Sequence, residues 1–160
     1  MQWDKATDII LIAAIAILSV FACLGIYQWI SRKSLKKVDK NLILMVVSLI
    51  LMAITYIIFD KVFILNVRPN GSGEASFPST HVMVVATIFL LVAQNLKYYV
   101  KSKTFRVILL IIMLALTTLT CFGRVLSNKH WLSDVLGGLA FALLFNVIYY
   151  LITKKGAKDE

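Results

Sequence analysis

Five long stretches without Asp, Glu, Lys or Arg constrain the fold of this chain more than any other feature. They are Ile9–Ile30, Asn41–Phe59, Val82–Asn95, Val107–Phe122 and Val135–Thr153. A helix needs about 20 apolar residues to cross a hydrocarbon core of roughly 30 Å. Four stretches reach or approach that length, and the third does so if its helix starts near Pro78 and runs to Tyr98.

The sequence therefore predicts an all-α, multi-pass transmembrane bundle with about five spanning helices, in a single domain over residues 1–160. Burial of all five stretches inside a globular protein is excluded, because 60% of the 160 residues are hydrophobic and too few polar residues remain to cover them. The first stretch does not resemble a signal peptide, since Asp4 and Asp8 lead it rather than a basic cluster and it is too long.

The basic residues predict the orientation of the bundle. Twelve of the 17 Lys and Arg fall on one side of a five-helix path, namely Arg32, Lys33, Lys36, Lys37, Lys40, Lys97, Lys101, Lys103, Arg106, Lys154, Lys155 and Lys158. Because cytoplasmic loops carry the excess of Lys and Arg, we expect the N-terminus outside and the C-terminus in the cytoplasm. The net charge of +9 is then a determinant of topology that also meets anionic headgroups, and no nucleic-acid partner is expected.

The outward side collects the residues that could carry chemistry. Both histidines, His81 and His130, and both prolines, Pro69 and Pro78, fall there. Polar residues that converge on one face of an apolar bundle are candidates for function. The two cysteines show no CxxC or metal-ligand spacing, so we expect neither a disulfide framework nor a bound metal, and no cofactor.

The first constellation is KVFILNVRP, residues 61–69. Lys61 and Arg68 are seven residues apart, so on a helix they share one face, and Pro69 marks the exit into a loop. Two cations so placed could bind an oxyanion, with the guanidinium as a bidentate fork. The alternative is a pair of interfacial cations that extend to lipid headgroups.

The second constellation is SFPSTH, residues 76–81. Ser76 could cap a helix that includes Pro78 in its first turn. Ser79, Thr80 and His81 would then lie where unpaired backbone N–H groups and the helix dipole attract anions. An ordinary helix cap with an incidental histidine is the alternative.

The third constellation is RVLSNKHWLSD, residues 124–134. His130 and Asp134 have i,i+4 spacing, so on a helix the carboxylate could accept one ring N–H and leave the other nitrogen free to attack. Gly123 is expected to end the preceding helix, with Arg124 just beyond it. A surface hydrogen bond without catalytic meaning is the alternative. Together the three constellations supply cations, a helix N-terminus and two histidines, which suits phosphoryl transfer.

These motifs, K-x6-RP, PSTH and R-x5-H-x3-D over residues 61–134, resemble the signature of the type 2 phosphatidic acid phosphatase superfamily. The resemblance implies that Lys61, Arg68 and Arg124 bind phosphate, together with Ser79 and the backbone amide of Thr80. It also implies that His130 attacks phosphorus, that Asp134 orients His130, and that His81 protonates the leaving oxygen. Thr80 replaces the usual glycine, Gly123 replaces a usual serine, and many members have six spanning helices rather than five.

The resemblance implies a phosphatase that acts on a lipid phosphate or diphosphate through a phosphohistidine. Because the site is expected to face outward, we expect a substrate in the outer leaflet, and the basic loops and small multi-pass form suit the cytoplasmic membrane. Too few carboxylates cluster on the outward side to hold two metal ions, so we expect a metal-independent enzyme. We expect undecaprenyl diphosphate as the substrate, with phosphatidylglycerophosphate and phosphatidic acid as alternatives. A catalytically silent lipid-phosphate binding or transport protein is the alternative of another class, although binding alone needs only the cations. The sequence does not indicate an oligomeric state.

Overall fold

The computed structural model describes residues 2–156 and consists almost entirely of helices. The elements are α1 (Gln2–Arg32), the short helix η1 (Leu35–Lys37), α2 (Lys40–Ile57), the π-helical turn η2 (Ile58–Val62), α3 (Thr80–Tyr99), α4 (Lys103–Leu126) and α5 (Leu132–Gly156). Five helical segments are long and apolar enough to cross a membrane. The prediction of an all-α bundle with about five spanning helices is confirmed, and Lys158 lies outside the described residues.

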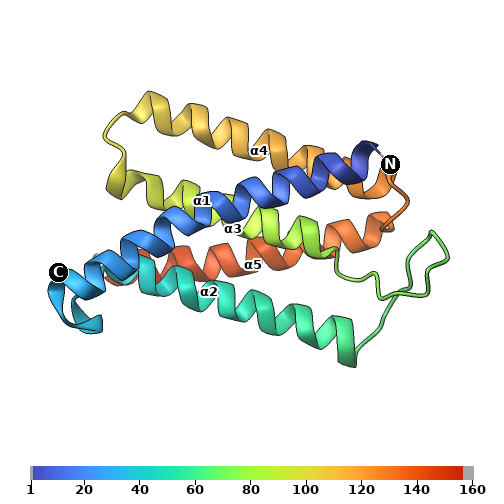
Figure 1. Cartoon of the computed structure of the whole chain (residues 1–160), viewed down its shortest axis with the longest axis horizontal. Coiled ribbons are helices and arrows are strands. Elements are labelled where there is room, and N and C mark those ends of the chain that lie inside the picture. The colour runs from blue at the N-terminus through green and yellow to red at the C-terminus, as the bar shows by residue number, and fades with distance from the viewer. Residues whose placement is uncertain (1, 157–160) are drawn as a thin grey trace.

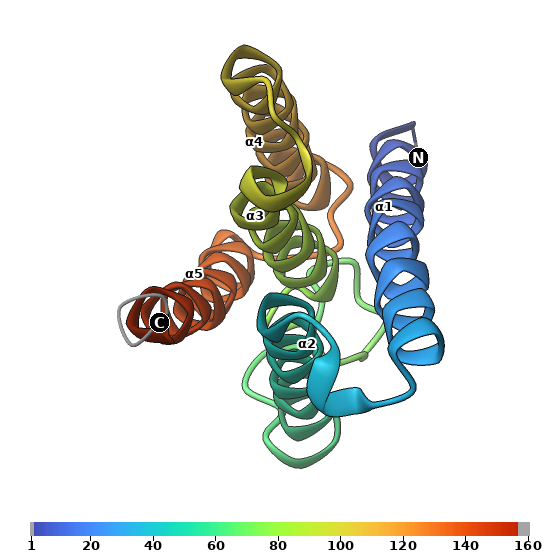
Figure 2. The same cartoon turned by 90° about the vertical axis from the view of Figure 1, so that its left-hand side faces the viewer.

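Helix α3 lies at the centre of the bundle and contacts all four other long helices (Figure 2). Most of its side chains are buried, whereas α1, α2, α4 and α5 expose most of theirs. Exposed apolar side chains on the outer helices are the expected surface where lipid is the solvent. The third apolar stretch thus forms a full 20-residue span, although as the inner helix it has the lowest mean hydropathy of the five spans.

The two ends of the bundle differ in structure (Figure 1). At one end lie the start of α1, the long connection between η2 and α3, and the short connection between α4 and α5; we call this the site end. At the opposite end, which we call the basic end, lie the α1–α2 and α3–α4 connections and the last turns of α5. In the described part of the chain no strand forms, but an isolated antiparallel bridge joins Val67 and Ala75 in the long connection.

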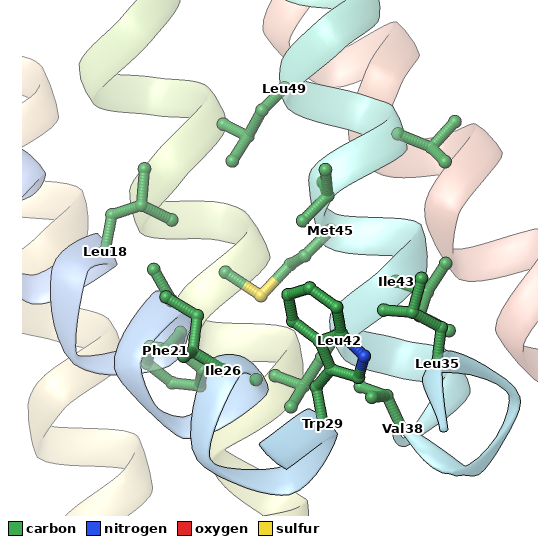
Figure 3. Close-up of a pocket in the computed structure, with 14 residues that line it drawn as sticks. Leu18, Phe21, Ile26, Trp29, Leu35, Val38, Leu42, Ile43, Met45 and Leu49 are labelled. Atoms are coloured by element: carbon green, nitrogen blue, oxygen red, sulfur yellow. The ribbon is translucent and has the colours of Figure 1, made fainter. Parts of the chain in front are cut away.

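An apolar cavity of about 460 Å³ opens between α1 and α2 near the basic end (Figure 3). Leu18, Phe21 and Met45 lie on its walls, and Trp29 and Val38 lie close to the α1–α2 connection. None of its lining side chains carries a charge, so it has no cation with which to bind a phosphate. The polar candidates of the sequence all lie elsewhere.

Candidate active site

Asp134 ties the connections at the site end to one another. It is fully buried in the first turn of α5, and its Oδ1 accepts a hydrogen bond from Nδ2 of Asn66 at 2.9 Å. Its Oδ2 accepts hydrogen bonds from the Ser76 hydroxyl and from the backbone N–H of Trp131. Its carbonyl oxygen accepts the Ser79 N–H at 2.9 Å. A carboxylate with this many donors is fixed in place and can hold its neighbours in register.

His130 lies just before α5 rather than within it, and this changes its relation to Asp134. Its Nδ1 donates to the Ser76 carbonyl at 2.9 Å, whereas Nδ1 and Oδ2 of Asp134 are 3.8 Å apart. The predicted direct hydrogen bond between His130 and Asp134 is therefore wrong, because His130 precedes the helix on which i,i+4 spacing would align the pair. The Ser76 hydroxyl lies between them, 3.3 Å from Nδ1.

This contact also determines which ring nitrogen of His130 is free. A backbone carbonyl can only accept, so Nδ1 carries the proton and Nε2 keeps its lone pair. Burial and the nearby Arg124 guanidinium lower the pKa of His130 from 6.5 to about 4. Both effects disfavour the charged ring, so His130 is neutral and able to act as a nucleophile at neutral pH.

Arg124 lies inside the last turn of α4, because that helix continues to Leu126. Gly123 is therefore not the end of a helix, and that prediction is wrong. A Cβ at Gly123 would lie 2.5 Å from Cγ2 of Thr7, so the missing side chain lets α1 approach α4 closely. Through this approach Nη1 of Arg124 donates to Oδ1 of Asp4 at 2.8 Å and lies 3.4 Å from the Thr7 hydroxyl.

His81 is the second residue of α3, and α1 reaches it as well. Its Nε2 lies 2.9 Å from Oδ1 of Asp8, one helical turn along α1 from Asp4. Arg124 is close enough to His81 to act on it electrostatically. The start of α1 therefore contributes one carboxylate to a cation and a second to a histidine, both singled out by the motifs.

The structure places Lys61 and Arg68 differently from the expectation. Helical structure ends at Val62, so the two do not share a helix face, and that prediction is wrong. The chain from Phe63 instead forms a loop in which the Arg68 N–H donates to the Glu74 carbonyl. This hydrogen bond and the Val67–Ala75 bridge hold the chain around Arg68 in an extended turn, so the helix does not continue from Val62 to Arg68.

Each of these two cations is paired with an acid. Nη1 of Arg68 lies 2.7 Å from Oε2 of Glu74, and Nζ of Lys61 lies 2.8 Å from Oδ2 of Asp60. Arg68 is largely covered and lines the cavity described below, whereas the Lys61 side chain is 74% exposed and does not line it.

The helix in the second constellation begins later than predicted. Ser79 is the N-cap and Thr80 the first residue of α3, so Ser76 does not cap it and Pro78 lies outside it. The Ser76 hydroxyl and carbonyl instead bind Asp134 and His130. The Thr80 N–H is left among the unpaired donors of a helix N-terminus, as an anion site requires.

In the part of the chain that the structure describes, three of the motif residues carry buried donors without a partner. Within the described chain, four buried side-chain polar atoms make no hydrogen bond, and three are Nε of Arg68, Nε of Arg124 and the Ser79 hydroxyl. Unpaired buried donors are costly and rare, so their concentration at one place needs an explanation. An oxyanion bound among them would satisfy all three.

A polar cavity of about 50 Å³ lies beside these groups. Arg68, Thr80 and His130 line it, together with Ser76 and Asp60. Arg68 and Arg124 both lower the pKa of His130, so both guanidiniums lie near the same imidazole. The structure thus brings together Arg68, Ser79, Thr80, His81, Arg124, His130 and Asp134, and leaves Lys61 at the margin.

Sequence reasoning missed Asn66, Asp4 and Asp8, and assigned Ser76 another role. The two acids did carry a signal, because their i,i+4 spacing beside a long apolar stretch is unusual for a membrane helix. Asn66 carried none, since a loop amide has no pattern that predicts its partner. No group of three potential metal ligands occurs within residues 2–156, and the expected absence of a metal stays a prediction.

Comparison with known proteins identifies the family. The profile of the PAP2 superfamily matches residues 60–157, which include all three motifs. The chain belongs to the PAP2 superfamily. The matched region starts within η2, so Asp4 and Asp8 of α1 lie outside it.

Two PAP2-related proteins extend the comparison. The chain is 31% identical over 91 residues to the lipid A 1-phosphatase of Porphyromonas gingivalis, a match that covers 55% of this chain and 18% of that relative. It therefore spans less than a fifth of that protein. The crystal structure of a transmembrane PAP2-type phosphatidylglycerolphosphate phosphatase from Bacillus subtilis superposes with a TM-score of 0.72 at 20% identity, covering 94% of this chain and 76% of that one. This PAP2 protein thus has the multi-pass membrane fold of that structure.

Proposed function

We propose that this PAP2 protein is a membrane phosphatase that hydrolyses a lipid phosphate or diphosphate through a phosphohistidine. The observation that carries the proposal is the set of unpaired buried donors on Arg68, Arg124 and Ser79 next to a neutral His130. Binding alone would need the cations but would not need an imidazole whose Nδ1 is held so that Nε2 stays unprotonated.

In the first step Nε2 of His130 attacks phosphorus, and the bond from phosphorus to the lipid oxygen breaks. His81 donates a proton to that oxygen, and Asp8 is a positioning residue that holds the His81 ring. Asp134 positions His130 through Ser76. Charge on the equatorial oxygens is stabilised by Arg68, Arg124, the Ser79 hydroxyl and the Thr80 N–H, the groups that such transfer requires.

In the second step water attacks the phosphohistidine, and the P–N bond breaks. His81, now neutral, takes a proton from that water, and inorganic phosphate leaves. Microscopic reversibility makes one histidine serve as the acid first and the base second.

The phosphate competes with carboxylates for the cations. Arg124, Arg68 and Lys61 are paired with Asp4, Glu74 and Asp60 respectively. Substrate binding exchanges these partners for phosphate oxygens, and by this exchange Lys61 reaches the phosphate from the margin of the site. Each cation then moves from one anion to another and is never buried alone.

For the substrate we propose undecaprenyl diphosphate, with the terminal phosphorus facing His130. Its lipid monophosphate is a good leaving group, and three cations match the charge of a diphosphate. The test is phosphate release by detergent-solubilised protein over undecaprenyl diphosphate, phosphatidylglycerophosphate, phosphatidic acid and lipid A 1-phosphate. If kcat/KM for the isoprenyl diphosphate is about tenfold or more below that for another lipid, the substrate is misassigned. Release from none of them refutes the phosphatase.

We also propose that the site end faces outward from the cytoplasmic membrane, on the basis of the twelve-to-five distribution of cations. A Cys23→Ala, Cys121→Ala background removes both native thiols. In intact cells an impermeant maleimide should label Ser72→Cys at the site end and should spare Ser34→Cys at the basic end. The reverse pattern would overturn the orientation.

A further inference from the structure

A second polar cavity, of about 350 Å³, lies at the basic end between α3, α4 and α5. Lys97 enters it from the last turns of α3, Lys103 and Arg106 from the first turn of α4, and Tyr150 from α5. In Figure 1 this region is at the opposite end of the bundle from the connections that hold the candidate active site. The phosphatase proposal makes no use of it.

Within residues 2–156, the three cations of this cavity have no acidic partner. No carboxylate lines the cavity, and among residues 2–156 none of the ion pairs involves Lys97, Lys103 or Arg106. Lys97 instead lies over the Tyr98 ring, with Nζ 4.8 Å from its centroid. At the site end, by contrast, every motif cation is paired with a carboxylate.

The start of α4 adds to the positive potential. Its first turn contains Lys103 and Arg106 and no acid. Cations are unfavourable at a helix N-terminus, where unpaired N–H groups carry partial positive charge. Ser102 caps only one of these groups, by accepting from the Phe105 N–H. An anion held between α3 and α4 would offset both the cations and the helix dipole.

The floor of the cavity can also form hydrogen bonds. Gln94 and Tyr149 line it, and each is fixed by a buried amide. Nε2 of Gln94 donates to Oδ1 of Asn146 at 2.8 Å, and the Tyr149 hydroxyl donates to Oδ1 of Asn95 at 3.0 Å. Polar groups inside membrane helices are expensive and mark functional places.

One wall of the cavity is apolar and faces the lipid. Val107 and Leu110 of α4 line it, and Val107 is 45% exposed. A ligand here meets cations at the membrane surface and apolar side chains one to two turns deeper. That order matches a phospholipid, whose phosphate lies at the surface and whose acyl chains extend into the bilayer.

We propose that this cavity binds an anionic glycerophospholipid of the leaflet at the basic end, with its phosphate between Lys97, Lys103 and Arg106 and its acyl chains along Val107 and Leu110. The inference concerns a site separate from the phosphatase site and stands whether or not that activity is found. A free phosphate ion has the same head chemistry but would make no use of the apolar wall.

Native mass spectrometry of the purified full-length protein tests the proposal, with phosphatidylglycerol and phosphatidylcholine as probes. We expect phosphatidylglycerol to be retained about tenfold or more in excess, since each cation near an anionic headgroup adds affinity. The variant Lys97→Gln, Lys103→Gln, Arg106→Gln should lose this preference. The matched control Lys33→Gln, Lys36→Gln, Lys37→Gln, which removes three charges at the same end, should keep it.

Three outcomes would overturn the proposal. Equal retention of both lipids by the wild type would show no headgroup preference. Equal loss in the two triple variants would show a diffuse basic surface rather than a site. Displacement of the lipid by millimolar inorganic phosphate would show a site for a soluble anion. If the triple variant fails to fold, Lys103→Gln alone, an exposed first-turn change, replaces it: retention should weaken, and unchanged retention would contradict the site.

Discussion

Oδ1 of Asp8 lies 2.9 Å from Nε2 of His81, although 73 residues separate them in the sequence. The neighbouring turn of α1 places Asp4 against Arg124, whose side chain is only 4% exposed. Helix α1 therefore closes the candidate site from outside the region that the family profile matches. Its two acids contact His81, the proposed proton donor, and Arg124, a proposed phosphate ligand, so the first helix is part of the proposed catalytic apparatus.

The Asp8–His81 contact predicts a leaving-group effect. Asp8→Asn should slow hydrolysis of a lipid monoester about tenfold, because His81, the proposed general acid, loses the carboxylate that positions its ring. A diphosphate should be affected less, since its leaving group needs little protonation. Steady-state kinetics on phosphatidic acid and undecaprenyl diphosphate measure the difference.

Asp39→Asn is the matched control for this experiment. Asp39 also forms an ion pair, with Arg32 at 2.8 Å, but at the basic end. Its replacement should leave both rates unchanged. An equal loss on both substrates in Asp8→Asn would mean that Asp8 supports structure and does not act through His81.

The proposed nucleophile predicts a trapped intermediate. His130→Ala should reduce turnover by about 10³-fold or more, as expected when the nucleophile is removed. Brief reaction of wild type with labelled substrate should give a phosphoenzyme that is labile in acid and stable in alkali, as a phosphoramidate is. Residual activity near wild type in His130→Ala would eliminate this residue as the nucleophile.

The burial of His130 predicts the acid limb of the pH profile. Its pKa is lowered to about 4 by burial first and by Arg124 second, so the ring takes up a proton only as the pH falls toward about 4. The neutral ring attacks, so kcat/KM should rise with pH through about 4 and should not fall between pH 7 and pH 5 on account of His130. Loss of the His81 proton should produce an alkaline limb and a bell-shaped profile.

The lowered pKa of His130 should also make the stability of the fold depend on pH. The folded pKa of His130 lies below its ordinary value of 6.5, so its contribution is complete above pH 6.5 and is lost as pH falls toward about 4. Thermal unfolding in detergent should show a smaller loss over this range in His130→Asn than in wild type. An equal loss of melting temperature in His130→Asn and wild type would contradict this. In the activity profile, an acid limb near pH 6.5 would show that burial and Arg124 do not lower the pKa of His130.

Chelation should have no effect on the reaction. The proposed site neutralises phosphate charge with Arg68, Arg124 and Lys61, and the described chain offers no cluster of three metal ligands. Phosphate release should therefore be the same in excess EDTA as in buffer alone. Loss of activity that Mg²⁺ restores would show that a metal ion takes part.

The spans and the motif residues were predictable because their signals are local. The length of an apolar stretch is enough to predict a spanning helix. The PSTH motif predicts that Ser79 and Thr80 lie at the start of a helix, whichever residue caps it. The position of His130 relative to Asp134 was not predictable, since i,i+4 spacing fixes geometry only where both residues are helical. The same reason explains Lys61 and Arg68, because the sequence did not show where η2 ends.

The contacts of α1 with Arg124 and His81 could not be predicted from the sequence, for a different reason. Asp4 and Asp8 meet Arg124 and His81 only through the packing of α1 on α3 and α4. That packing depends on Gly123, which in the sequence is equally compatible with a helix end. A contact between distant helices that rests on one missing side chain has no periodic signature.

Gly123 predicts the last effect, on both stability and activity. In Gly123→Ala the new methyl group would lie 2.5 Å from Cγ2 of Thr7, which is fully buried. Overpacking of this kind costs about 1–3 kcal/mol, and here it should move the start of α1 away from Arg124 and His81. We expect a lower melting temperature in detergent, measured by tryptophan fluorescence, together with a reduced kcat/KM.

Thr7→Ser separates the packing effect from any other consequence of the alanine. The serine lacks the Cγ2 methyl that the new side chain would strike, while its hydroxyl still reaches Nη1 of Arg124 and the Asp4 carbonyl. The double variant Gly123→Ala, Thr7→Ser should therefore recover most of the stability and the activity, and Thr7→Ser alone should change little. If the double variant is as impaired as Gly123→Ala, the glycine is needed for something other than the approach of α1, and the role assigned to that helix loses its structural basis.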